Sequence, residues 1–262
     1  MTDLDNAHAK MEAAPGDDAA RLRFFERLAD TELFMLLTAE PEGDQIDPDV
    51  FDVEGQSFVL VFDRSERLTE FTGAPAPYAA LSGRMLAQML AGLQIGLGLN
   101  LDVAPSAMLI PADALGWLVD TLDQGPAEEE AQIEEIAPPA GLPEAVIEGV
   151  DRKLATATGL ARMAYLVEVK YAIGTRGHLL AFIDAVPGAE PALASAVGEA
   201  LTFSGVEAGA IDVAFFRASD PLASGLARHG LRFDLPVPAE PHIPEAQRTG
   251  PGMDPNVPPK LR

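Results

Sequence analysis

Short β-type runs occur in adjacent pairs in both halves of this chain, and amphipathic helical stripes separate the pairs. Val50 to Val53 and Ser57 to Phe62 form one such pair, and Met163 to Ile173 and His178 to Val186 form another. The strict strand–helix–strand alternation of a doubly wound parallel sheet is missing. The pattern therefore predicts an α+β protein of two small domains, each a mostly antiparallel sheet with packed helices.

Length and one change in composition support this division into two domains. At 262 residues the chain is long enough for two domains of ordinary size. Between residues 124 and 143, proline, glycine and a run of glutamates replace the apolar periodicity, and one helical turn is expected around Ile133. We predict a first domain at 1–123, an acidic Pro-rich linker at 124–142, a second domain at 143–236 and a disordered Pro-rich tail at 237–262.

Capping residues and apolar stripes set the expected element boundaries. Asp17 or Asp18 can cap a helix that ends at Asp30, and the spacing of Asp63 and Glu66 is typical of a capping box. Ser82 can cap the next helix. Further helices are predicted from stripes at 115–122, 146–154, 193–201 and 222–226, and further strands at 33–37, 95–101, 106–110, 211–216 and 232–235.

The charge is strongly negative and unevenly distributed. The net charge is −23, and residues 1–125 hold 22 acidic but only 7 basic side chains, whereas residues 161–262 hold 11 and 9. Because no basic patch can neutralise phosphates, neither nucleic acid nor an anionic membrane is expected as a partner. The acidity is interpreted either as a means of solubility or as an attraction for a basic partner.

The cellular compartment is predicted from two features. The chain has no cysteine, which excludes disulfides, thiol nucleophiles and Cys-ligated metal. The segment from Met1 to Met11 lacks the basic n-region of a signal peptide. We therefore expect a cytoplasmic protein.

Searches for catalytic motifs favour no particular reaction. Gly96 and Gly98 begin a dinucleotide-type pattern, but Leu101 stands where a small residue is needed. The four histidines are dispersed, and the acidic loop around Asp47 lacks the spacing of a calcium-binding loop. We expect no metal, no cofactor and no catalytic residue that the sequence can identify.

The order of motifs in the first half resembles a known family. Phe58 to Phe62 followed by Asp63 to Leu68 is similar to the strand-to-helix element of SseB-type N-terminal domains. Ser82 to Ala87, Ile95 to Asn100 and Ala107 to Leu118 follow in the family's order, so the resemblance covers about residues 20–122. Residues 143–236 are similar in length and order to an SseB C-terminal domain. The family is named for enhanced serine sensitivity, a phenotype, so the resemblance implies the architecture and a bacterial cytoplasmic origin but no reaction.

Four residues are candidates for binding. Asn100 matches an Asn of the family's pattern and either contacts a ligand or stabilises a turn. Tyr171, Arg176 and His178 flank the expected second-domain turn, and aromatic and Arg side chains are over-represented in binding hot spots.

Three functions are compatible with this sequence. The favoured hypothesis is a non-catalytic protein-binding or regulatory module that contacts an unidentified cytoplasmic protein. The alternatives are an enzyme with catalytic residues dispersed over loops and an assembly protein. The oligomeric state stays open.

Overall fold

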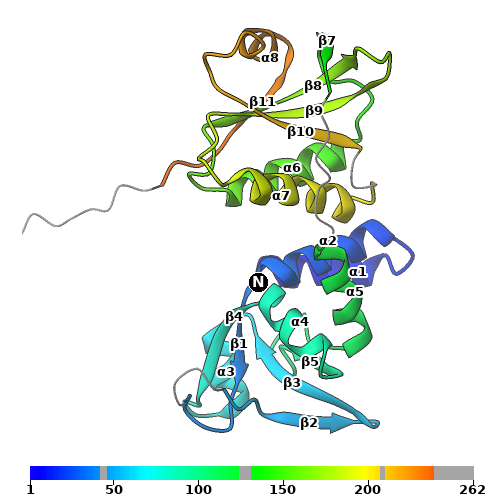
Figure 1. Ribbon diagram of the computed structural model, residues 1–262. Coiled ribbons are helices and arrows are strands. Elements are labelled where there is room, and N and C mark those ends of the chain that lie inside the picture. The colour runs from blue at the N-terminus through cyan, green and yellow to red at the C-terminus, as the bar shows by residue number, and fades with distance from the viewer. Residues whose placement is uncertain (42–45, 124–130, 207–209, 239–262) are drawn as a thin grey trace, which may run out of the picture.

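The computed structural model describes residues 1–41, 46–123, 131–206 and 210–238, which form two domains, each built on its own sheet (Figure 1). The first domain contains α1 (Asp3–Ala13), α2 (Asp18–Asp30), β1 (Glu32–Leu36), β2 (Val50–Val53), β3 (Gln56–Phe62), α3 (Ser65–Thr72), β4 (Tyr78–Ser82), α4 (Gly83–Ala91), β5 (Ile95–Leu99), β6 (Met108–Ile110) and α5 (Ala112–Leu122). The second contains β7 (Ile133–Ala137), α6 (Glu144–Thr156), β8 (Met163–Tyr171), β9 (Arg176–Ile183), α7 (Glu190–Phe203), β10 (Ile211–Phe216), α8 (Ala223–His229) and β11 (Leu231–Asp234). These elements confirm the predicted α+β class.

The first sheet is mixed and mostly antiparallel. Its strand order is β4-β1-β3-β5-β6, and β2 pairs with the start of β3. The central strands β3 and β5 are parallel, with Val59 opposite Leu97. All other pairs between its described strands are antiparallel. The parallel pair brings the carboxyl ends of β3 and β5 to one edge of the sheet, where polar residues from both strands can meet.

The second sheet is also mixed, with one parallel pair among antiparallel ones. Its order is β10-β9-β8-β11, and β7 pairs with the far end of β8. The strands β9 and β10 are parallel, and α7 makes the crossover between them. The strands β8 and β9 form a long antiparallel hairpin, as predicted.

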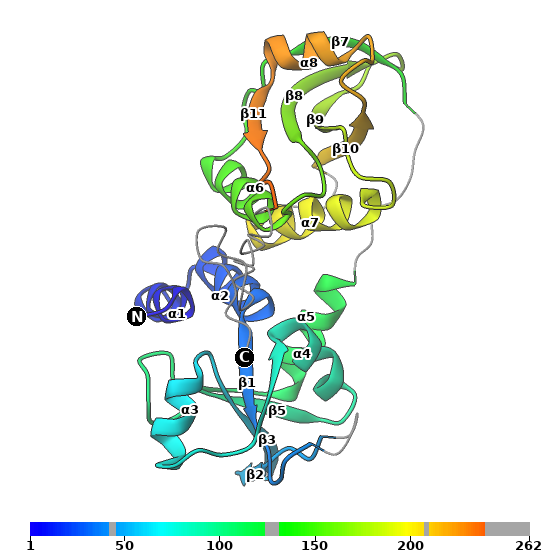
Figure 2. The ribbon, with the colours of Figure 1, turned by 90° about the vertical axis from the view of Figure 1, so that its left-hand side faces the viewer.

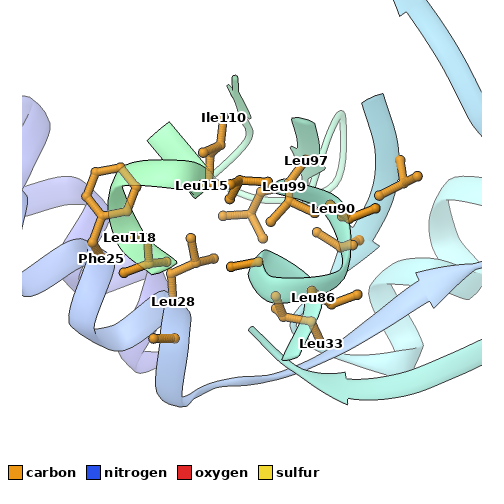
Figure 3. Close-up of a cluster of buried hydrophobic side chains, with 14 of the residues drawn as sticks. Phe25, Leu28, Leu33, Leu86, Leu90, Leu97, Leu99, Ile110, Leu115 and Leu118 are labelled. Atoms are coloured by element: carbon orange, nitrogen blue, oxygen red, sulfur yellow. The ribbon is translucent and has the colours of Figure 1, made fainter. Parts of the chain in front are cut away.

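The core of the first domain lies between the sheet and α2, α4 and α5. The leucines of α4 and α5 point toward those of β5, together with Leu28 and Leu33 (Figure 3). Burying one such side chain contributes about 1.5–3 kcal/mol. Phe203 at the end of α7 packs into this same core, so the second domain contributes a side chain to the first. Helices of both domains thus meet between the two sheets, as Figure 2 shows.

The second domain has helices on both faces of its sheet. One face packs against α6 and α7 through Val150, Leu180 and Val197. The other face packs against α8 through Leu226. Both faces of β8 and β9 are therefore buried over much of their length, which explains the continuous apolar runs at 163–167 and 179–183.

A strand lies within the predicted linker and corrects one expectation. The helical turn expected around Ile133 is wrong, because β7 occupies this position. Ile136 pairs with Val169 of β8 and packs under α8, and Glu134 forms an ion pair with Lys170 at 2.8 Å. Tertiary pairing outweighs the local acidic and Pro-rich composition here. Residues 124–130 of the predicted linker (124–142) and residues 239–262 of the predicted tail (237–262) lie outside the described residues.

Two features at helix starts also differ from the sequence analysis. The capping box expected at Asp63 is absent, because α3 begins at Ser65 and Asp63 binds Thr2 and Arg67 instead. The helix α1 was not predicted, although Thr2 and Asp5 form a complete capping box at its start.

Candidate functional site

Asn100 is fully buried at the carboxyl end of β5, in the left-handed region with a φ of +47°. Its side-chain Oδ1 accepts a hydrogen bond from the Asp63 N–H at 3.1 Å, and its Nδ2 donates to Ser106 Oγ at 2.9 Å. Both ends of the amide are therefore used within the domain. Of the two interpretations in the sequence analysis, this geometry supports the turn-stabilising one.

Asn100 belongs to a larger buried group, the Asp5–Arg67 network, whose members are Thr2, Asp5, Asp63, Arg67, Asn100 and Ser106. The Arg67 guanidinium bridges Asp5 Oδ2 at 2.5 Å and Asp63 Oδ1 at 2.6 Å, and Ser106 Oγ donates to Asp5 Oδ1 at 2.6 Å. Burial alone would raise the pKa of Asp5, but hydrogen bonds from Arg67 and Ser106 hold it well below its ordinary value. The network fixes α1 to the carboxyl ends of β3 and β5.

The other three predicted residues lie together on the β8–β9 hairpin, and each has a partner within the chain. Tyr171 Oη donates to Asp212 at 2.5 Å, and burial together with this carboxylate raises the pKa of Tyr171. Arg176, 62 % exposed, donates to Glu168 at 2.9 Å. His178 Nε2 donates to the carbonyl of Ala140 at 2.9 Å. The three residues thus lie on one hairpin, and each forms a hydrogen bond within the chain.

A second charged group, which the sequence analysis missed, lies where the two domains meet. The inter-domain charge cluster consists of Glu26, Asp30, Arg84, Arg152, Lys153 and Glu199. Arg84 of α4 makes a two-pronged contact with Glu199 of α7, at 2.7 and 2.8 Å. The buried Lys153 of α6 donates to Glu199 at 3.0 Å and to Asp30 of α2 at 2.7 Å. No sequence signal could have found the cluster, because its members are up to 173 positions apart and share no motif.

Burial has opposite outcomes for the two glutamates of the cluster. It acts to raise the pKa of Glu199, but hydrogen bonds from Arg84 and the charge of Lys153 outweigh it, so the pKa is lowered. The pKa of Glu26 is raised by burial, which Lys153 and Arg152 oppose only in part. The nearest guanidinium, that of Arg152, is 3.9 Å from Glu26.

An exposed apolar surface runs along α4. Met85 and Met89 of α4 and Leu93 in the turn that follows it, which we call the α4 apolar face, are spaced four residues apart and are 47 %, 38 % and 64 % exposed. Leu86 and Leu90 occupy the neighbouring face and are buried in the core (Figure 3). The helix therefore has more apolar side chains than its own domain covers.

The comparison with protein families gives one match. Residues 4–117 match the model of the SseB protein N-terminal domain. This part of the chain is an SseB N-terminal domain. The comparisons with curated proteins and with solved structures found no match. The match confirms the family suggested by the sequence motifs and extends it to α1, which lies before the region of resemblance.

The SseB domain also forms one wall of a cleft. The cleft has a volume of about 800 Å³ and lies between α1 and α2 of the SseB domain and α6 of the second domain, so we call it the α1–α2–α6 cleft. Glu26 and Arg152 of the inter-domain charge cluster line it. Figure 2 shows α6 above α1 and α2. Its size is within the usual range for sites that hold small molecules.

Two further properties concern metals and membranes. Among the described residues, no group of three or more acidic or His side chains could hold a metal ion. Within that same part of the chain, none of the helices combines the length and the apolar character that crossing a membrane requires.

Proposed function

We propose that this member of the SseB family is a non-catalytic binding module that contacts a cytoplasmic protein through the α4 apolar face. The observation that carries the proposal is the exposure of Met85, Met89 and Leu93 at helical spacing. Apolar residues placed four apart on a helix present a continuous stripe, which is a typical docking surface for another protein.

Methionine supports this proposal in particular. Its flexible thioether side chain adapts to partners of different shapes, and methionines are over-used at binding surfaces of this kind. The two α4 methionines sit on a rigid helix whose other face is anchored in the core by Leu86 and Leu90. The surface is thus fixed in position while its side chains can adjust.

The charge of the surrounding domain suggests the chemistry of the partner. Residues 1–125 hold 22 acidic and 7 basic side chains, so the region of the chain that carries the apolar stripe is strongly negative overall. A partner with an apolar anchor flanked by Lys and Arg would be steered toward this surface. We therefore expect a partner whose contact site is apolar at its centre and basic at its rim.

The test compares two surfaces of the same chain. The wild type, Met85→Lys with Met89→Lys, and Tyr171→Ala with Arg176→Ala would each be used to purify partners from the native cytoplasm. A partner identified by mass spectrometry would then be purified and titrated against all three. We expect the α4 variant to bind at least about tenfold more weakly, because apolar hot spots contribute about 2 kcal/mol or more.

The hairpin variant is the matched control, since it tests the predicted candidates Tyr171 and Arg176. Unchanged binding of this variant would leave the α4 apolar face as the contact site. Equal binding by the wild type and the α4 variant would contradict the proposal. Loss of binding only in the hairpin variant would show that the partner binds at the β8–β9 turn instead.

One observation favours an enzyme as the second candidate function. Glu26 is buried beside the α1–α2–α6 cleft, and burial raises its pKa, as is common for carboxyl groups that take part in acid–base catalysis. Purified wild type and Glu26→Gln would be incubated with a native metabolite extract, and the change in each metabolite measured by mass spectrometry. Turnover that Glu26→Gln abolishes would replace the binding-module proposal with the enzyme.

A further inference from the structure

The α1–α2–α6 cleft brings together four cationic side chains in a chain that has few of them. Lys10 of α1, Arg23 and Arg27 of α2, and Arg152 of α6 all line it. Lys10, Arg23 and Arg27 are three of the seven basic residues within residues 1–125. Nearly half of that region's basic side chains therefore face one cleft.

These cations have few partners of their own. Lys10, Arg23 and Arg27 form no ion pair with any described residue, whereas Arg21 on the same helix pairs with Asp18 at 3.0 Å. The Nε atom of Arg23 is buried and has no hydrogen-bond acceptor in the described part of the chain. A buried guanidinium N–H without an acceptor is unfavourable, and an oxyanion placed in the cleft would supply one.

Four acidic side chains, those of Asp3, Asp17, Glu26 and Glu148, also line the cleft and match its four cations in number. Asp17 is engaged at the start of α2, where it accepts hydrogen bonds from the backbone of Ala19 and Ala20. Glu148 lies 3.8 Å from Arg152 on its own helix. The pKa of Glu26 is raised by burial, so this carboxyl loses its charge more readily than an exposed one. Among the described residues, Lys10, Arg23 and Arg27 therefore form no ion pair with the acidic side chains of the cleft.

We propose that the α1–α2–α6 cleft binds a small organic anion that carries two or more carboxylate or phosphate groups. Arg23 and Arg27 hold one group through their planar donors, and Arg152 holds another from the second domain. Alanines of α1 and α2 leave the space that such a ligand needs. Because its cations come from both domains, the ligand also ties the second domain to the SseB domain. This site shares no residue with the α4 apolar face and does not depend on the proposed protein partner.

The test uses two probes that separate the two anion chemistries. Citrate and inorganic pyrophosphate would each be titrated into the full chain by calorimetry, at constant ionic strength, and the melting temperature recorded. We expect saturable binding and a rise in melting temperature with at least one probe. Citrate alone would indicate a carboxylate ligand, and pyrophosphate alone a phosphate ligand.

Matched variants separate the cleft from general charge effects. Arg23→Gln with Arg27→Gln should weaken binding about tenfold or more, because hydrogen bonds to charged groups are lost. Arg21→Gln removes a positive charge from the same helix outside the cleft and should leave binding unchanged. If circular dichroism shows that the double variant does not fold, Arg152→Gln makes the same test from the second domain. Binding of neither probe, or equal binding by the wild type and a folded cleft variant, would overturn the proposal.

Discussion

Asp5 and Glu26 are almost equally buried, at 1 % and 3 % exposed, yet their pKa values shift in opposite directions. Asp5 lies in the Asp5–Arg67 network, where Arg67 and Ser106 donate to it. Glu26 lies at the edge of the inter-domain charge cluster, 3.9 Å from its nearest guanidinium. Hydrogen bonds to the charged form together outweigh burial at Asp5, whereas burial prevails at Glu26, for which no such hydrogen bond is present among the described residues. The first region is thus built for stability, whereas the second leaves a buried carboxyl poorly satisfied where two domains meet.

The largest effect is expected from breaking the Asp5–Arg67 network. Arg67→Met leaves the carboxylates of Asp5 and Asp63 without their shared cation. We expect the free energy of unfolding to fall by about 3–5 kcal/mol, the usual loss when one partner of a buried pair is removed. Urea denaturation of the full chain measures it.

The control for this variant is Arg21→Met, whose ion pair with Asp18 is 60 % and 82 % exposed. An exposed pair contributes about 1 kcal/mol or less. Equal losses in the two variants would mean that the buried network stabilises the domain no more than a surface pair does.

The next effect concerns the inter-domain charge cluster. Lys153→Met leaves Asp30 and Glu199 facing the interface without their shared ammonium group. We expect a loss of about 3 kcal/mol and a weaker coupling of the two domains. The fluorescence of Trp117, the only tryptophan, reports the SseB domain, whereas circular dichroism reports both domains.

Separate unfolding midpoints for these two signals would appear in Lys153→Met and not in the wild type. Lys170→Met is the control, because the pair of Lys170 with Glu134 is exposed and lies within the second domain. Coincident midpoints in both variants would show that the charge cluster does not couple the domains.

A smaller effect tests whether Asn100 is structural. Asn100→Gly keeps the left-handed backbone but removes both side-chain hydrogen bonds, so we expect a loss of about 2 kcal/mol. Asn100→Ala should lose about 1 kcal/mol more, because an L side chain is strained at this φ. Wild-type stability of the Gly variant, combined with loss of a partner, would assign Asn100 to binding.

The smallest effect is the pH dependence of the free energy of unfolding that Asp5 and Glu26 cause. We expect it to have opposite signs for the two carboxyls. The folded pKa of Asp5 is depressed, so its contribution is complete above its unfolded value of 3.8 and is lost as the pH falls through the folded pKa. The folded pKa of Glu26 is raised, so its ionisation opposes folding at neutral pH, and this opposition disappears as the pH falls toward 4.5.

These opposite signs are visible in matched variants. Compared with Glu26→Gln, the wild type should gain stability as the pH is lowered from about 7 to 4.5. Compared with Asp5→Asn, the wild type should lose its advantage below 3.8. Urea midpoints across this range measure both. Parallel pH profiles for the two comparisons would mean that burial alone governs both groups.

The sequence predicted the elements whose signals are local. The helix α2 begins after Asp17 and ends at Asp30 as expected, and Ser82 caps α4. The apolar runs of β8 and β9 predicted a hairpin, and the antiparallel pairing of the two strands confirms it. Such elements depend on capping groups and side-chain periodicity, which neighbouring residues determine.

Two strands that were missed, β4 and β7, are stabilised by distant partners. The edge strand β4 is held by β1, and β7 by β8, although neither sequence is strongly β-type. Asp63 could have capped α3, but the more favourable partners Thr2 and Arg67 lie in space beside it. Propensity is a weak prior that such contacts outweigh.

The sequence by itself determined the α+β class, the division into two sheets and the SseB assignment of the first half, because these follow from patterns of neighbouring residues. It also singled out Asn100, whose turn is local. Only the tertiary structure decided which charges meet. The Asp5–Arg67 network joins residues 62 positions apart, and the contact of Arg84 with Glu199 spans 115. Electrostatic contacts act over a few ångströms of space regardless of chain distance, so no spacing in the sequence could encode them.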